Sequence, residues 1–533
     1  MISWAKPGTI AKEHPIYPVL VLGNILITTF LAVLSAVATI VADDSIQGDL
    51  ALSDPLATWL TTLYLLGVNT TVPSASWFAD RFGYKTMYAL GVTIFTLASA
   101  LAGFSTNFAM IGSARLLEGI GAGFIFPIGL ATIVQNLSPK QLPLALILYV
   151  MAAFGAGFAI GLPVAGYLTQ FISWRWIFFL IIPIGLIGTL SCWIVHEETE
   201  KIKTSRFDYG GFICFALFVG SFLVALTYGP MLATDEGWRS TPILICFAVA
   251  FICLLLTIYI ETHHENPMIP IVLFKNPVYA VTCVAMFLLG MSIFASVSTL
   301  IQYMVDALLY ERFVAGKIGI IYGVSLAVFS ILANLFIRKI PVPIMTFIGL
   351  SLLVYSYFLN NILDWQTGPK QILTILSIRG IALGLSLGPA TIQALQHVPK
   401  ELANKGATLL TFFRQVGGTY GGTLIAIIVI KRKIFHAARF GEQANTQLPG
   451  YQTTFQKLYT HYNTTLFDHG DDSAALAKAT IIRNIEIQAF IQAINDAMIV
   501  FAYVTMAVAL ILILLSLKNW KKSRSQETAN APE

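Results

Sequence analysis

Charged residues are scarce in this sequence. Asp, Glu, Lys and Arg make up 11% of the 533 residues, whereas 56% are hydrophobic, and the mean hydropathy is +0.76. A soluble globular domain with so few polar side chains could not cover its own surface. The composition therefore excludes an ordinary soluble protein and indicates a chain that crosses a lipid bilayer many times.

The sequence also lacks the signatures of disulfides, metal sites and nucleotide binding. Its five cysteines all fall inside hydrophobic runs, so no disulfide framework is expected. No His/Cys cluster has metal-ligand spacing, no G-x-x-x-x-G-K-[ST] loop is present, and no Ser/His/Asp set stands out. We therefore expect no metal, no cofactor, no nucleic-acid partner, no ATP-driven pump and no enzyme.

Long hydrophobic runs dominate the chain, and a helix needs roughly 20 apolar residues to cross the hydrocarbon core. Short loops and tails on the side of the termini hold seventeen basic residues, against five on the other side. Because basic loops stay in the cytoplasm, we expect both termini to be cytoplasmic, in the cell inner (plasma) membrane. Fourteen runs predict an all-α polytopic membrane protein with 14 transmembrane helices; they begin near Tyr17, Leu56, Thr86, Phe108, Leu142, Trp174, Tyr209, Pro242, Val278, Ala315, Val342, Gln371, Gly406 and Asp496.

Two segments lie outside these runs. Residues 431–495 are predicted to form a long outer loop, and the amphipathic stretch "IIRNIEIQAFIQAI" within it would lie on the outer surface or support the last helix. Residues 518–533 form a short tail that is basic near the membrane and is expected to be cytoplasmic and disordered.

A short charged loop joins the second and third runs. In "SWFADRFGYK", the charged residues Asp80, Arg81 and Lys85 surround Gly83, which permits a tight turn that can pin two helix ends together. Ordinary positive-inside charge is the alternative interpretation. The loop resembles the G-x-L-A-D-R-x-G-R-K signature of the major facilitator superfamily, and we assign it as a gating loop.

Five later segments resemble the same superfamily, in the same order along the chain. "ARLLEGIGAG" resembles the helix-4 signature R-x-x-Q-G-x-G. "FAIGLPVAGYL" resembles the helix-5 antiporter signature G-P-x-x-G-G, and its region supplies the motif residues Gly157, Gly161, Pro163 and Gly166. "SWRWIFFLIIPIG", "IRGIALGLSLGP" and "FFRQVGGTYGG" resemble the fourteen-helix drug:proton antiporter branch.

The resemblance implies a fold and an activity. It implies two six-helix halves, residues 1–200 and 269–517, joined by two extra linking helices in 201–268, with the loop 431–495 inside the second half and the tail 518–533 after it. It implies a secondary active transporter, a proton-coupled exporter of small amphipathic compounds or drugs that works by alternating access. The partners would be a small-molecule substrate, protons and the lipid bilayer, and the resemblance allows periplasmic or outer-membrane export proteins.

Charged residues inside the membrane point to a coupling site. Arg115 and Glu118 are three residues apart, so they share one helical face and should face the bundle interior. We assign both to proton coupling, with a static ion pair as the alternative. The branch carries an Asp in helix 1 where this sequence has Ser35, and a Gln where it has Glu118, which indicates a relocated titrating carboxylate. Asp43 and Asp44 are interpreted as solvated loop charge rather than an antechamber for cations.

Polar residues at membrane depth are candidates for the substrate cavity, and they are Arg379, Gln302, Tyr303, Gln393 and Arg414. Cations in both halves would suit an anionic or zwitterionic substrate better than a cationic drug. A second hypothesis is therefore a dedicated carrier of one endogenous metabolite, an organic acid or a siderophore-like anion, which could import or work without protons. A third hypothesis, of another class, is a non-transporting membrane receptor or scaffold.

Overall fold

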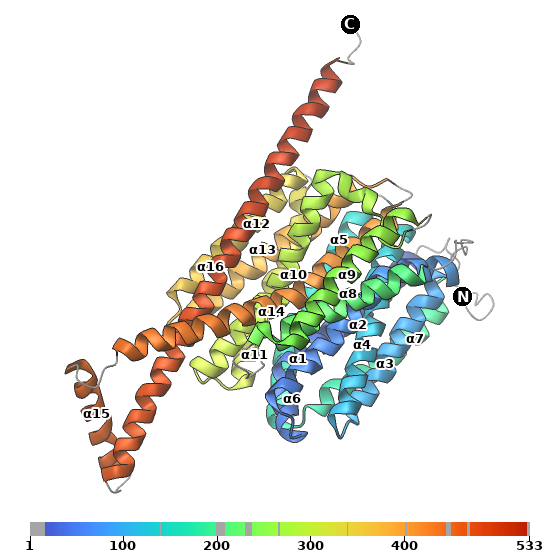
Figure 1. Ribbon diagram of the computed structural model, residues 1–533. Helices are drawn as coiled ribbons and strands as arrows, with labels where there is room; N and C mark the ends of the chain where they lie inside the picture. The colour runs from blue at the N-terminus through green and yellow to red at the C-terminus, as the bar shows by residue number, and fades with distance from the viewer. Residues whose placement is uncertain are drawn as a thin grey trace.

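The computed structural model describes residues 16–138, 140–198, 208–229, 237–264, 267–337, 339–399, 402–443, 449–465 and 470–529. Within these ranges every regular element is a helix, and the helices pack side by side as a bundle (Figure 1). The predicted all-α membrane fold is therefore confirmed. Prolines at the first turns of several helices, such as α1 and α9, suit positions where the backbone N–H has no partner in the helix.

The helices fall into three groups in chain order. We call the first the N-terminal bundle; it comprises α1 (Tyr17–Asp49), α2 (Asp54–Phe82), α3 (Tyr84–Gly103), α4 (Phe108–Asn136), α5 (Leu142–Val150), the π-helix η1 (Met151–Ala156), α6 (Gly157–Phe171) and α7 (Arg175–Val195). An inserted pair follows, α8 (Tyr209–Tyr228) and α9 (Thr241–His263). The C-terminal bundle comprises α10 (Pro277–Gln302), the π-helix η4 (Tyr303–Ala307), α11 (Arg312–Ile337), α12 (Val342–Phe358), α13 (Pro369–Leu395), α14 (Ala403–Gln443), α15 (Pro449–Thr465) and α16 (Gly470–Ala529).

Thirteen spans of the described chain are long and apolar enough to cross a membrane. They correspond to thirteen of the fourteen predicted runs. The remaining run, which begins near Leu56, forms the 29-residue helix α2, and this helix packs against α4 and α14 inside the bundle. The chain is a multi-pass membrane protein, and the exact division into 1–200, 201–268 and 269–517 stays a prediction.

The predicted outer loop 431–495 is mostly helical. α14 continues for 41 residues to Gln443, and α16 runs for 60 residues from Gly470. Together with α15, their ends project from the bundle (Figure 1). Ile491 and Ile494 of the amphipathic stretch are buried in the core, so this stretch supports the last helix as part of α16. The expectation that the tail is disordered was wrong up to Ala529, because the helical backbone of α16 continues to that residue, and its cytoplasmic location stays a prediction.

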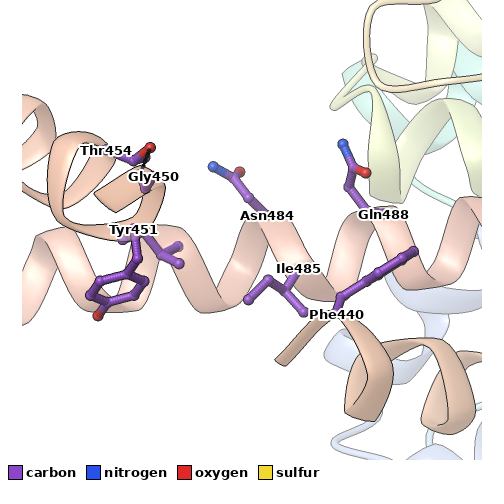
Figure 2. Close-up of a pocket in the computed structure, with 8 residues that line it drawn as sticks. Phe440, Gly450, Tyr451, Thr454, Asn484, Ile485 and Gln488 are labelled. Carbon is purple, nitrogen blue, oxygen red and sulfur yellow. Dashed lines mark hydrogen bonds between the residues drawn. The ribbon is translucent and has the colours of Figure 1, made fainter. Parts of the chain in front are cut away.

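One cluster ties the projecting helices together. Asp496 on α16 accepts hydrogen bonds from Arg432 Nε at 2.5 Å and His436 Nε2 at 2.7 Å, both on α14. A hollow of about 340 Å³ lies farther out, and Phe440, Tyr451 of α15 and Ile485 of α16 are among the residues that line it (Figure 2). These contacts make the projection a packed helical structure.

Candidate functional site

A cavity of about 450 Å³ lies between the N-terminal and C-terminal bundles. α1 and α2 form one wall, α10 and α14 form the facing wall, α8 of the inserted pair contributes a third, and Phe490 of α16 also lines it. Its lining residues come from the second half of α1, α8 and α10 and from the first half of α2. The cavity therefore occupies the half of the bundle toward the end of α1.

The lining is largely apolar, with hydroxyl groups distributed over both walls. Several of these hydroxyls donate to the carbonyl four residues earlier in their own helix: Ser298 to Phe294 at 2.8 Å, Thr299 to Ala295 at 2.9 Å and Thr419 to Gln415 at 2.9 Å. A hydroxyl that donates its hydrogen to a backbone carbonyl can only accept hydrogen bonds from a ligand. Among the described lining residues, Asp43 is the one charged side chain.

The predicted pair Arg115 and Glu118 lies inside the N-terminal bundle, and both side chains are 0% exposed. Arg115 Nη1 lies 2.5 Å from Glu118 Oε2 and donates to Ser35 Oγ at 2.9 Å. Ser35 Oγ donates to Glu118 Oε1 at 3.3 Å, and Ser99 Oγ of α3 donates to the same oxygen. Ser35, which stands where the drug:proton antiporter branch has its helix-1 Asp, thus contacts the Glu118 carboxylate of this chain.

An aromatic residue separates this pair from the cavity. Tyr64 lines the cavity, and its ring centroid lies 4.4 Å from Arg115 Cζ, a cation–π distance. The Tyr64 hydroxyl donates to the carbonyl of Ala32 at 3.0 Å, which fixes the ring between α1 and α2. Neither Arg115 nor Glu118 lines the cavity itself.

The two other membrane-depth arginines do not line this cavity either. Arg379 Nη1 donates to the carbonyl of Ser296 at 3.2 Å, and its guanidinium lies 5.2 Å from the Tyr357 ring centroid. Arg414 of α14 lies 4.9 Å from the ring centroid of Phe154 in η1, across the interface between the bundles. Arg379 thus packs against a carbonyl and an aromatic ring and Arg414 against an aromatic ring, and each keeps at least one buried N–H group without a hydrogen-bond partner among the described residues. Neither takes its expected place in the cavity.

Of the three other residues predicted to line the substrate cavity, one lies in the cavity and two lie outside it. Gln302 lines the cavity. Tyr303 does not, because its hydroxyl donates to the carbonyl of Asp364 at 2.5 Å, and Gln393 does not, because its Nε2 donates to Ser516 Oγ of α16 at 3.0 Å. These contacts correct the expectation that all five candidates surround one cavity.

The predicted gating loop connects the two bundles at the end opposite the cavity. Gly83 has φ +101°, a conformation that favours glycine, so the turn between α2 and α3 depends on it. Asp80 accepts from the Tyr84 hydroxyl at 2.9 Å, and Asn404 Nδ2 of α14 donates to the same hydroxyl at 3.1 Å. The Lys85 backbone N–H donates to Glu198 Oε1 at 3.2 Å. Sequence reasoning missed Tyr84, which stands where the signature has a basic residue.

The predicted helix-5 motif also lies at a bundle interface. Gly157 faces Val33 of α1, and a Cβ added at Gly166 would lie 3.0 Å from the carbonyl oxygen of Arg312 in α11. The π-helix η1 comes directly before Gly157, and such π-bulges recur at functional sites. Pro163 lies inside α6 and meets Gly316 of α11. The small residues therefore bring α6 close to both α1 and α11.

Asp43 is a cavity-lining residue that sequence reasoning placed wrongly. Asp44 is exposed and forms an ion pair with Arg312, as the interpretation of solvated charge predicts. Asp43 lines the cavity, and among the described residues its buried Oδ1 has no hydrogen-bond partner. The sequence feature that could have predicted this location is the spacing of Ala36, Ile40 and Asp43, which places all three on one helical face.

Comparisons with known proteins agree with this architecture. Residues 25–422 match the Major Facilitator Superfamily. The chain is 28% identical to the multidrug transporter protein MdtP of Bacillus subtilis (strain 168), over 78% of this chain and 75% of that protein. It is 24% identical to the multidrug export protein EmrB of Escherichia coli (strain K12), over 81% of this chain and 84% of that protein.

Solved structures share the fold at low sequence identity. A bacterial homologue of the human lysosomal transporter Spinster, inward-facing and unoccupied, has a TM-score of 0.56 at 14% identity and covers 95% of this chain and 98% of its own. A D-xylose–proton symporter has a TM-score of 0.55 at 14% identity, covering 77% of this chain and 90% of its own. With the match over 25–422, the chain belongs to the Major Facilitator Superfamily, a family of transporters.

Proposed function

We propose that this transporter is a proton-coupled exporter of small amphipathic compounds that works by alternating access in the inner membrane, with both termini in the cytoplasm. The observation that carries the proposal is the cavity of about 450 Å³, because its walls come from both bundles. A site between two bundles is opened to either side when the bundles rock against each other. The similarity to MdtP and EmrB, which are named as multidrug transporters, supports export of amphipathic compounds.

The position of the cavity fits one state of such a cycle. With the predicted orientation, the cavity lies in the outer half of the membrane. Toward the cytoplasm, Asn404 of the C-terminal bundle bonds Tyr84 of the N-terminal bundle. At mid-depth, Asn69 Nδ2 donates to Thr419 Oγ1 at 2.7 Å, also between the bundles. These contacts would have to break for the cavity to become accessible from the cytoplasm.

Glu118 is the proposed proton carrier. A proton on Glu118 would neutralise its carboxylate and leave Arg115 as a fully buried cation without its counter-ion, which costs several kcal/mol. Relaxation of Arg115 would displace Tyr64, because the ring lies directly on the guanidinium. Since Tyr64 is part of the cavity wall, protonation of Glu118 is thereby linked to the shape of the substrate site.

The test is gradient-driven flux in inverted membrane vesicles with a mixed substrate panel. Glu118→Gln should abolish flux driven by a pH gradient, while the transported compound still binds and its equilibrium binding no longer depends on pH. Ser99→Ala is the matched control, because it removes one hydrogen bond to Glu118 and keeps the charge. Unchanged driven flux in Glu118→Gln would remove this residue from the mechanism.

The anion-carrier hypothesis loses part of its support. It rested on the missing helix-1 Asp and on the buried arginines, and Arg379 and Arg414 do not line the cavity. The receptor or scaffold hypothesis is distinguished by the same vesicle experiment, because it predicts no gradient-driven flux of any compound.

A further inference from the structure

The cavity contains an unexplained carboxylate. Asp43 of α1 lines it, and the buried Oδ1 of this residue has no hydrogen-bond partner in the described part of the chain. A carboxylate oxygen taken out of water without a partner is costly, so such groups are normally paired or bind a ligand. The neighbouring coupling pair does not need Asp43, because Glu118 already faces Arg115.

The nearby cations are engaged elsewhere. Arg312 forms its ion pair with Asp44 and donates to Ser45 Oγ at 2.9 Å. Arg115 is paired with Glu118 and lies behind the Tyr64 ring. No Lys, Arg or His is among the described residues that line the cavity. Within the cavity, therefore, no described side chain supplies the positive charge that would neutralise the half-buried Asp43, which leaves that role to a ligand or a proton.

The rest of the lining favours a ligand that donates hydrogen bonds. Ser298, Thr299 and Thr423 line the cavity and donate their hydroxyl hydrogens to backbone carbonyls, so these hydroxyls can only accept hydrogen bonds from a ligand. Apolar surface from α8, α10 and α14 surrounds them. An acceptor-lined apolar cavity with one carboxylate is electrostatically complementary to a compound with one positive charge and a large apolar body.

We propose that Asp43 anchors a site for a singly charged amphipathic organic cation, with the cation at Asp43 and its apolar body among Leu226, Phe294 and Ile427. This inference rests on the proposed function, since it takes the cavity as the transport site. It reverses the substrate charge that the membrane-depth arginines suggested, because the arginines lie outside the cavity and the carboxylate lies inside it.

The inserted pair takes part in this site. Leu223, Leu226 and Thr227 of α8 line the cavity, and the hydroxyl of Tyr420 on α14 donates to the carbonyl of Val219 on α8 at 2.9 Å. Trp59 of α2 lies 5.3 Å from Tyr228 between ring centroids, which ties α8 to the N-terminal bundle as well. α8 therefore closes the side of the cavity where α2 and α14 meet, and its side chains help to set which cations fit.

The experiment uses two probes of the same shape and opposite charge, tetraphenylphosphonium and tetraphenylborate. Equilibrium binding is measured on the purified full-length protein without any ion gradient. The wild type should prefer the phosphonium, and Asp43→Asn should weaken phosphonium binding by about tenfold or more, through loss of the Coulombic attraction, without weakening borate binding. Asp44→Asn is the matched control, because it removes the same charge one residue away, outside the cavity. It should change phosphonium binding by about threefold at most.

Two further measurements keep the outcome decisive. Asp43→Glu should retain most phosphonium binding, because it keeps the charge. If Asp43→Asn does not fold, carbodiimide labelling of Asp43 in the wild type replaces it, and bound phosphonium should protect this residue from modification. Tighter binding of the borate by the wild type, equal losses in the two Asn variants, or labelling without protection would each overturn the proposal. Loss of driven flux with intact Asp43-dependent binding would instead refute the proposed function alone.

Discussion

Moving the carboxylate from position 118 to helix α1 tests whether Arg115, Glu118 and Ser35 form one buried network that can hold the titrating group at either position. Ser35 Oγ lies 2.9 Å from Arg115 Nη1 and 3.3 Å from Glu118 Oε1. A carboxylate at position 35 would therefore reach the same guanidinium from the neighbouring helix. We predict that Ser35→Asp restores to Glu118→Gln both stability and gradient-driven flux.

The expected magnitude follows from the burial of Arg115. Its side chain is 0% exposed, and removing the partner of a buried ion pair costs about 3–5 kcal/mol. Glu118→Gln should lose a stability of this order, and the double variant should recover most of it, because the counter-charge returns. Ser35→Asp alone should be unfavourable, since two carboxylates would then share one guanidinium.

Thermal unfolding and vesicle flux are the two assays, and Ser99→Asp in the Glu118→Gln background is the matched control. Ser99 bonds Glu118 from α3, and no bond from Ser99 to Arg115 is present among the described residues. A carboxylate at position 99 should therefore give less recovery than one at position 35. Equal behaviour of the two double variants, or no recovery in either, would refute the idea that the titrating group has been relocated within one network.

Two further predictions concern the cavity wall and pH. Leu226→Trp on α8 should reduce transport of large substrates more than of small ones in a flux panel, because the larger side chain fills part of the cavity; equal effects on all sizes would argue against α8 as a wall. Burial lowers the pKa of His196, which follows α7, to about 4. Because the unfolded side chain titrates near pH 6.5, unfolded chains bind more protons below that pH. Stability should therefore fall by up to about 3 kcal/mol between about pH 6.5 and 4. His196→Gln should flatten this pH dependence of thermal unfolding, and an unchanged slope would contradict the assignment.

Sequence patterns predicted the membrane-spanning helices well, because the bilayer strongly constrains the length and hydrophobicity of any segment that crosses it. Apolar runs of membrane length had to become helices, since no other local structure satisfies their backbone in lipid. The ion pair of Arg115 and Glu118 followed from three-residue spacing on a helix. The gating loop and helix-5 motif lie at bundle interfaces, which is consistent with their predicted roles, although those roles stay predictions.

The cavity could not be predicted in the same way, because its lining depends on which polar groups find partners elsewhere. Arg379 and Arg414 look like ligand-binding residues in the sequence, yet a carbonyl and aromatic rings from other helices hold them. Asp43 looks like loop charge beside Asp44, yet on helix α1 a step of one residue, about 100° around the helix axis, separates a solvated carboxylate from one that lines the cavity. Such differences arise from tertiary packing, which the pattern of a single chain does not specify.

The long extensions of α14 and α16 were missed for a related reason. Residues 431–495 are polar enough to suggest a loop, and their helical structure is held by contacts between distant segments. Asp496 joins Arg432 and His436, which are 64 and 60 residues earlier in the chain. Packing between α14 and α16 therefore stabilises helices in a segment whose polar composition indicates a loop.

Proton-driven movement of a compound through the cavity is the claim on which the account depends. Its most direct measurement is uptake into inverted vesicles under an imposed pH gradient, with wild type and Glu118→Gln compared at equal protein levels. The account predicts accumulation that collapses when the gradient is dissipated and that is lost in the variant. Accumulation that ignores the gradient, or that persists fully in the variant, would contradict it.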